Sequence, residues 1–286
     1  MLPVALGLGA AACIGVADYI AGISSRRLAP LQVGFWVQLI ALGVVALTLL
    51  VTRPAFALSP ALWGLAAGVG SGIGLTLLYR GLATGAMSLV APIVGCSVVL
   101  PVVFAVLRGE SLTLLSGSGI TVVFAGILIA SLQAGSEPKS STVARADRDR
   151  HAILCAIGSA IGFGMFLVLI DIGSTGSAAD SLWTTSASRV TAFGVQALLV
   201  LLGPRAISHP GPVLPGLVAI AVLDQVATVL LGFGATTEAY GIVSILFGLY
   251  PVITALLGAL LLGERLTRMQ GTGAALAVVG VLLVSI

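Results

Sequence analysis

The chain has 286 residues and a formal net charge of +3; 58% of its residues are apolar and only 8% are charged. A soluble domain carries about 25% charged residues, because it needs a polar surface. A globule of this size cannot hide so much hydrocarbon from water, so the composition excludes a soluble enzyme, a disordered chain and a nucleic-acid-binding protein.

Ten apolar runs are each long enough to cross a bilayer, whose hydrocarbon core of about 30 Å takes roughly 20 helical residues. The runs are continuous rather than alternating, which predicts helices and an all-α integral membrane protein. In chain order the predicted spans are residues 3–22, 30–51, 61–80, 86–107, 114–132, 152–172, 181–202, 213–235, 239–261 and 269–286.

The break between the fifth and sixth spans differs from the other breaks. Residues 133–150 read QAGSEPKSSTVARADRDR, a polar and charged stretch without an apolar cluster. Such a composition is typical of a solvated linker. We therefore expect a first unit of five spans at residues 1–132 and a second unit of five spans at residues 151–286.

The two halves are related in sequence. When the chain is shifted by 154 positions, residues 109–128 match residues 263–282 at eight of twenty ungapped positions, including the turn Gly-Glu-x-Leu-Thr. Each half has an odd number of predicted spans, so the second half must lie upside down relative to the first. The sequence thus predicts ten transmembrane helices as two inverted five-helix repeats, an arrangement typical of secondary carriers.

Basic residues indicate the orientation and the host. The loops after spans 1, 5, 7 and 9 carry nine basic residues, and the loops after spans 2 and 4 carry two. Basic loops stay in the cytoplasm, so the linker is predicted to be cytoplasmic and both termini external. Arginine outnumbers lysine twelve to one, which favours a GC-rich bacterial host and its cell (inner) membrane.

A family resemblance rests on residues 83–119 and 236–273, where a five-span repeat ends in a Gly-Glu-x-Leu turn and a Gly-x-Gly helix, and on the opening IGVADYIAGISSRR. These features resemble the EamA domain of the drug/metabolite transporter superfamily. The resemblance implies export of a small metabolite, such as an amino acid or a drug. It also implies that spans 1, 3, 4, 6, 8 and 9 line a central cavity and that spans 5 and 10 support it. In some similar proteins both termini are cytoplasmic, the opposite of the charge-based orientation.

Four charged residues stand out within the predicted spans, where burial is costly enough to suggest a function. Arg189 and Asp224 lie at similar depths, as do Asp18 and Arg80, so we expect two ion pairs. Each pair could instead only hold helices together. If transport is coupled to protons, Asp18 or Asp224 is the expected proton site, because an aspartate removed from water can bind a proton near neutral pH.

Aromatic residues in the spans are further candidates for a binding cavity, because they can wall an apolar substrate or hold a cation by cation–π attraction. The alternative for these positions is a lipid-facing or interfacial belt. Tyr240, Ser244, Phe247 and Tyr250 are spaced to share one face of span 9. The remaining candidates are Trp36, Tyr79, Phe163 and Phe166.

Glycine and proline predict local features. The sequence Phe247-Gly-Leu-Tyr-Pro251 predicts a helix break, because proline lacks the N–H that a helix uses. Glycines at four-residue spacing in spans 3 and 6 predict close helix packing; they are Gly64, Gly68, Gly72, Gly70, Gly74, Gly158 and Gly162.

The other reactive residues have simpler interpretations. Asp171, Asp180 and Glu238 fall at span ends and are expected to be hydrated. Glu110 and Glu264 lie in turns, where capping or pairing with Arg108 and Arg265 is expected. The three cysteines sit in apolar runs as small buried residues, and the sequence contains no pattern that predicts a metal or a cofactor.

Together these patterns predict a secondary transporter rather than an enzyme, working by alternating access as a monomer or homodimer. Its expected partners are a small-molecule substrate, the lipid bilayer and, as a candidate coupling ion, protons; nucleic acid is excluded. The rival interpretations are a facilitator without a coupling ion, a membrane-embedded enzyme of lipid metabolism, and a structural membrane protein. The predicted inverted repeat argues against the last two, which need no such symmetry.

Overall fold

The computed structural model describes residues 2–25, 27–84, 93–109, 114–131, 143–203, 207–262 and 268–285. Every regular element within these ranges is a helix, as the apolar runs predicted. The elements are α1 (Leu2–Ser24), α2 (Pro30–Thr52), α3 (Leu58–Thr84), the 3₁₀ turn η1 (Cys96–Val98), α5 (Val99–Leu107), α6 (Leu114–Ser131), α7 (Val143–Ser174), α8 (Ala178–Leu201), the 3₁₀ turn η2 (Gly211–Val213), α9 (Leu214–Ala235), α10 (Tyr240–Phe247), α11 (Tyr250–Leu262) and α12 (Arg268–Ser285).

Six described segments are long and apolar enough to cross a membrane, which confirms a multi-pass membrane protein. They are Leu2–Ser24, Leu31–Thr52, Leu58–Leu78, Arg150–Ser174, Gly211–Ala235 and Tyr240–Gly258. Two shorter apolar helical segments are Ile93–Leu107 and Gly117–Gly126. The helix α8 is less apolar because it buries a polar face, which includes Thr184, Ser188, Arg189 and Gln196.

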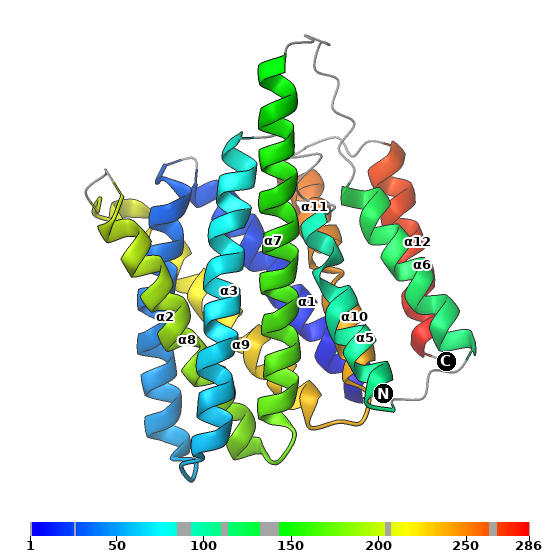
Figure 1. Cartoon of the computed structure of the whole chain (residues 1–286), viewed down its shortest axis with the longest axis horizontal. Coiled ribbons are helices and arrows are strands. Elements are labelled where there is room, and N and C mark those ends of the chain that lie inside the picture. The colour runs from blue at the N-terminus through cyan, green and yellow to red at the C-terminus, as the bar shows by residue number, and fades with distance from the viewer. Residues whose placement is uncertain are drawn as a thin grey trace.

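The helices stand side by side, and the ends of the chain lie together. In Figure 1, α1 begins and α12 ends at the lower end of the molecule, whereas α7 begins at the upper end. We call the lower end the terminal end and the upper end the linker end. This placement agrees with the prediction of an odd number of spans in each half.

Glycine allows α3 to approach its neighbours closely. A Cβ atom added to Gly64 would lie 2.2 Å from the carbonyl oxygen of Thr184 on α8, and one added to Gly68 would lie 2.0 Å from that of Ser188. On α7, a Cβ added to Gly162 would lie 2.7 Å from the carbonyl oxygen of Gly70 on α3. The predicted close packing of spans 3 and 6 is confirmed, because no larger residue fits these contacts.

The predicted break in span 9 is also confirmed. The helix α10 ends at Phe247 and α11 begins at Tyr250. Across the break, the N–H of Gly248 donates to the carbonyl of Ser244 at 3.1 Å, and that of Leu249 donates to the carbonyl of Leu246 at 3.1 Å. The turn tightens there because its bonds span three residues as well as four.

The main hydrophobic core lies on the terminal side of the molecule, where α1, α7, α9 and α10 meet. Leu167, Leu231, Val243 and Leu246 are each at most 1% exposed. Tyr240 belongs to this core, and its hydroxyl donates to the carbonyl oxygen of Leu167 at 3.0 Å. This packing fixes the start of α10 against α7.

The prediction that Asp171 is hydrated is wrong. Its side chain is 6% exposed, and the guanidinium of Arg108 donates to its Oδ2 at 2.8 Å. The face of α7 that carries Asp171 turns toward the end of α5, so the guanidinium of Arg108 lies against the carboxylate. Glu238 is exposed as expected, and Asp180 caps α8 together with Ser177.

Glu110, Glu264 and Arg265 lie outside the described residues, so the predicted capping or pairing in those two turns stays a prediction. Cys155 is buried and Cys13 and Cys96 are half-buried, and none of the three forms a disulfide.

Candidate functional site

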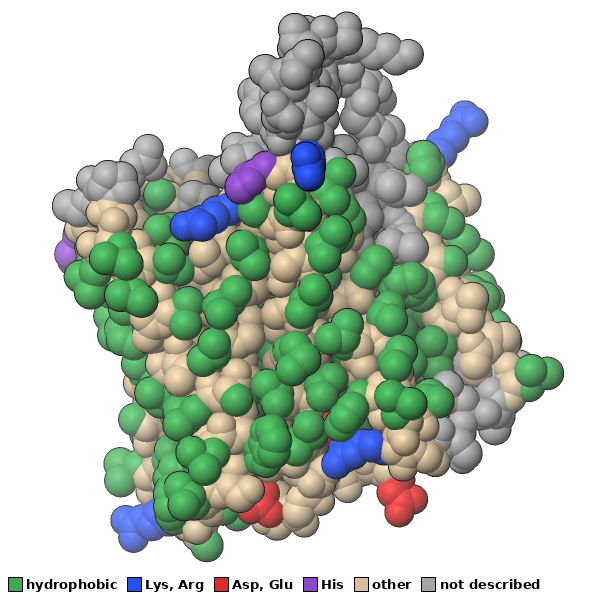
Figure 2. All heavy atoms as spheres, in the orientation of Figure 1, with side chains coloured by type: hydrophobic (Ala, Val, Ile, Leu, Met, Phe, Trp, Pro, Cys, Tyr) green, Lys and Arg blue, Asp and Glu red, His purple; other side chains and the backbone are tan. Residues whose placement is uncertain are grey.

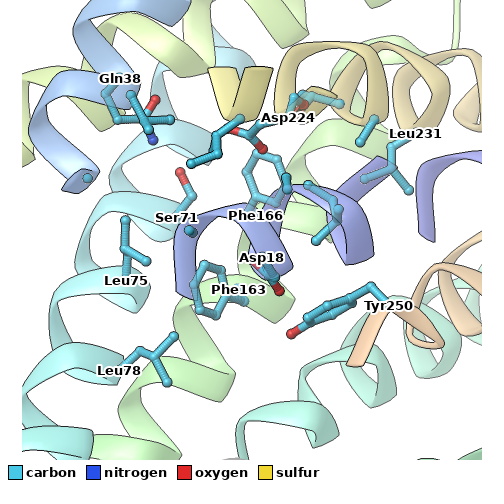
Figure 3. A pocket seen from close by; sticks show the side chains of 18 of the residues that line it. Asp18, Gln38, Ser71, Leu75, Leu78, Phe163, Phe166, Asp224, Leu231 and Tyr250 are labelled. Carbon is cyan, nitrogen blue, oxygen red and sulfur yellow. Dashed lines mark hydrogen bonds between the residues drawn. The ribbon is translucent and has the colours of Figure 1, made fainter. Parts of the chain in front are cut away.

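A cavity of about 230 Å³ lies among helices from both halves of the chain. Its walls come from α1, α2, α3, η1, α7, α8, α9, α10 and α11, and most of the lining is apolar, with side chains such as Ile14, Val33, Leu75 and Leu231. Figure 3 shows Asp18, Asp224, Phe163 and Tyr250 among the side chains around it. The lining includes the six spans implied by the family resemblance and adds spans 2 and 7, through α2 and α8.

The cavity lies in the middle of the molecule; its lining from α1, α2 and α3 is nearer the linker end, whereas its lining on α9 runs from Ile220 to Leu231, into the half nearer the terminal end. Its lining residues on α1 lie between Ile14 and Ala21, in the second half of that helix, and those on α2 lie in the first half, between Val33 and Gln38. The lining residues on α3 run from Ser71 to Leu78, again nearer the linker end. The core around Tyr240 occupies the terminal side instead.

An arginine-centred network forms one wall of the cavity. Arg189 of α8 donates through Nη1 to Oδ2 of Asp224 at 2.5 Å, so the predicted ion pair between α8 and α9 is confirmed. Its Nε donates to Oε1 of Gln225 at 3.1 Å, and its Nη2 donates to the carbonyl oxygen of Asp224 at 3.0 Å and to the hydroxyl of Thr228. The guanidinium is therefore satisfied from three directions, and only 7% of the Arg189 side chain is exposed.

Asp18 has a different environment. It lies on α1, lines the same cavity and is exposed within it. Among the described residues, Asp18 makes no ion pair and no hydrogen bond through its side chain. The predicted pair with Arg80 does not form, because Arg80 is an exposed residue near the end of α3 that does not line the cavity.

Four of the predicted aromatic residues do meet at the cavity. Phe163 and Phe166 line it from α7, Phe247 from the end of α10 and Tyr250 from the start of α11. The rings of Phe247 and Tyr250 lie 5.4 Å apart between centroids. The two rings belong to different helices, because Phe247 ends α10 and Tyr250 begins α11, one on each side of the break in span 9.

Other predicted site residues lie elsewhere. The indole of Trp36 donates to the carbonyl oxygen of Ser208 at 3.0 Å and does not line the cavity. Tyr240 and Ser244 are buried, because α10 packs against α1 and α5 and only its last residue, Phe247, reaches the cavity. The side chain of Tyr79 lies outside the described part of the chain.

Sequence reasoning missed several polar residues of the site. Gln38 and Ser71 line the cavity from α2 and α3, and Gln225 and Thr228 hold Arg189. A signal for the latter two was present, because Gln225 is next to Asp224 and Thr228 follows it by one helical turn. Gln38 was also detectable as a polar residue in the middle of an apolar run.

Comparisons with known proteins agree with this architecture. The sequence model of the EamA-like transporter family matches residues 1–132 and 150–286. No curated protein matches the chain. A solved structure described only as the crystal structure of a protein is similar in fold, with a TM-score of 0.78 and 17% sequence identity over 99% of this chain and 96% of that chain. Because the family model covers nearly all of the sequence, this chain belongs to the EamA-like transporter family.

Proposed function

We propose that this chain is a secondary transporter that exports a small organic metabolite across the cell membrane by alternating access. The observation that carries the proposal is the cavity, which both halves line and which contains an ion pair, a second carboxylate and four aromatic rings. Family membership supports transport, and the resemblance noted in the sequence supports the outward direction.

The proposed architecture is ten spans in two inverted repeats, and helix packing supports it. Exchanging the halves replaces α1 by α7, α2 by α8, α3 by α9, the η1–α5 segment by α10–α11, and α6 by α12. Under this exchange the packing of α1 on α9 becomes that of α7 on α3, and the packing of α3 on α8 becomes that of α9 on α2; both members of each pair are present. The contact between α6 and α12 maps onto itself.

The helix breaks supply a second argument for the repeat. The turn η1 begins at Cys96, next to Gly95, which aligns with Gly248 in the break between α10 and α11. The first half has no proline at the position that aligns with Pro251, but Pro101 lies four residues after Ser97 and cannot donate to its carbonyl, which favours a tightened turn there. The two broken segments also pack in related ways, against each other and against α7 and α1.

The proposed orientation places the linker end in the cytoplasm. Among the described residues, Arg27, Arg80, Arg150 and Arg268 lie at the linker end, while Arg53 and Arg108 lie at the terminal end. The acidic residues Asp180 and Glu238 lie at the terminal end, and Asp147 and Asp149 belong to the start of α7 at the linker end; Figure 2 shows the described acidic side chains of its visible face toward the lower end. This distribution follows the positive-inside rule. In this orientation the lining that α1, α2 and α3 contribute lies on the cytoplasmic side, where an exporter takes up its substrate.

Asp18 is the proposed site of a coupling proton. Of the two aspartates expected for this role, Asp224 is held by Arg189. Asp18 lines the cavity without an ion-pair partner among the described residues, so its carboxylate can gain or lose a proton without breaking a salt bridge.

A resistance screen with a matched pair of variants tests the proposed function. Cells that overexpress the chain are challenged with toxic amino acids, amines and drugs, and we expect protection against one chemical class. Ser71→Trp fills the cavity and should abolish this protection, whereas Val69→Trp, two residues away on an exposed face of α3, should preserve it. Membrane expression of both variants is measured in parallel. Full protection by a well-expressed Ser71→Trp variant would contradict the role of the cavity as the transport path.

A further inference from the structure

Among the described residues, the charged side chains that line the cavity are one arginine and two aspartates. The charge of the arginine is already compensated, because Arg189 donates four hydrogen bonds from its five N–H groups: two to Asp224, one to Gln225 and one to Thr228. An anionic substrate would have to displace a carboxylate that already binds Arg189 at 2.5 Å. The network therefore makes this wall of the cavity formally neutral.

Asp18 remains as the uncompensated charge of the described lining. Its carboxylate has no hydrogen-bond donor or cation among the described residues, although it lies in a mostly apolar cavity inside the membrane-spanning part of the chain. A carboxylate in such a place is costly unless a cation or a proton offsets its charge. One positive charge in the cavity would therefore balance the carboxylate of Asp18.

The aromatic rings indicate what kind of cation fits. Phe163, Phe166, Phe247 and Tyr250 present ring surface to the cavity, and aromatic faces attract ammonium groups within about 6 Å. An inorganic divalent cation would require six or more oxygen ligands. The lining is instead dominated by hydrocarbon, and of its oxygen-bearing side chains only Asp18 and Asp224 are carboxylates; the others are Gln38, Ser71, Ser97, Thr228 and Tyr250.

We propose that the cavity selects a monovalent organic cation with an apolar body, such as an amine or a quaternary ammonium compound, and that Asp18 is its counter-ion. This inference rests on the proposed transport function and specifies its substrate class. The aromatic rings hold the apolar body, and the paired Arg189 and Asp224 exclude anions by leaving no cation free to receive them.

Binding of three probes with the same aromatic body tests the charge preference. The full chain in lipid nanodiscs is titrated with benzyltrimethylammonium, which is cationic, with neutral 2-phenylacetamide, and with anionic phenylacetate. We expect benzyltrimethylammonium to bind at least about tenfold more tightly than either of the other two. Asp18→Asn should weaken binding of the cation by about tenfold or more and should leave binding of 2-phenylacetamide unchanged. Glu238→Gln removes an exposed carboxylate far from the cavity lining and should change neither.

Two results would overturn the inference: equal affinity for the three probes, or unchanged affinity of Asp18→Asn for the cation. Flux of the same probes into proteoliposomes separates this failure from failure of the proposed function. If phenylacetate or 2-phenylacetamide is transported and Ser71→Trp blocks its flux, the chain is a transporter but not a cation-selective one. If benzyltrimethylammonium binds in an Asp18-dependent manner and never crosses the membrane, the cation site stands and the transport proposal fails.

Discussion

Arg189 is the most constrained residue of the site, since a buried guanidinium needs a partner for each of its donors. Asp224 accepts through its carboxylate and its carbonyl, and Gln225 and Thr228 accept one hydrogen bond each, so four of the five N–H groups are bonded. Placing both ions away from water is costly, and these hydrogen bonds offset that cost. The pair consequently fixes α8 against α9 at the level of the cavity.

A double-mutant cycle measures this pair. Arg189→Met keeps most of the side-chain length but leaves Asp224 without its cation, so we expect the free energy of unfolding to fall by about 3–5 kcal/mol. Combining it with Asp224→Asn removes both charges and should cost clearly less than the sum of the two single changes. Thermal or denaturant unfolding in detergent provides the measurement. Additivity within about 0.5 kcal/mol would show that the two side chains do not interact.

The sequence correctly predicted one of the two ion pairs and wrongly predicted the other. Matching depth correctly joined Arg189 to Asp224, but the same criterion wrongly joined Asp18 to Arg80. Depth follows from position along a helix, whereas the direction of a side chain depends on the rotation of that helix, which tertiary packing sets. Asp171 shows the same limit, because its burial depends on where Arg108 lies, 63 residues earlier in the chain.

At the scale of the helix, α3 is the element that joins the two halves. It packs extensively against α7 on one side and against α8 on the other. Its glycines face both neighbours, so backbone meets backbone without side chains between them. Such contacts favour association in a bilayer, where van der Waals packing replaces much of the hydrophobic driving force.

Matched glycine substitutions test this packing. Gly68→Ala places a methyl group 2.0 Å from the Ser188 carbonyl oxygen, so α3 and α8 must separate. We expect a loss of about 1–3 kcal/mol in stability, the usual cost of overpacking. Gly43→Ala on α2 meets nothing within 4 Å and should be neutral or stabilising, because alanine favours helix. Melting temperatures in detergent compare the two, and equal shifts would contradict the close contact.

The break in span 9 was predictable because glycine and proline act through local backbone chemistry. Its consequence for the site was only partly predictable. The spacing of Tyr240, Ser244, Phe247 and Tyr250 suggested one common face, yet the first two turns of α10 are buried and only Phe247 and Tyr250 reach the cavity. The spacing of residues predicts which of them share a face of a helix. How much of that face is buried depends on the neighbouring helices, which the spacing does not reveal.

At the scale of the whole molecule, the sequence predicted helices, membrane spans and family, because these follow from composition, run length and motif. Six spans meet the criteria of length and hydropathy among the described residues, and the full count of ten with its inverted symmetry stays a prediction. The lining by α2 and α8 was not predicted, since it depends on how the halves fit together. The sequence also could not predict which access state the structure shows, because the same sequence must support both access states of a carrier.

The most direct test of alternating access is the accessibility of the cavity from each side of the membrane. In a chain whose three cysteines are replaced, single variants Ser71→Cys, Arg150→Cys and Glu238→Cys are labelled with a membrane-impermeant maleimide in right-side-out and inside-out vesicles. Ser71 lines the cavity, whereas Arg150 and Glu238 are exposed at the linker and terminal ends. We predict that Arg150→Cys reacts only from the cytoplasm, that Glu238→Cys reacts only from outside, and that Ser71→Cys reacts from both. Labelling of Ser71→Cys from one side alone would contradict the transport mechanism.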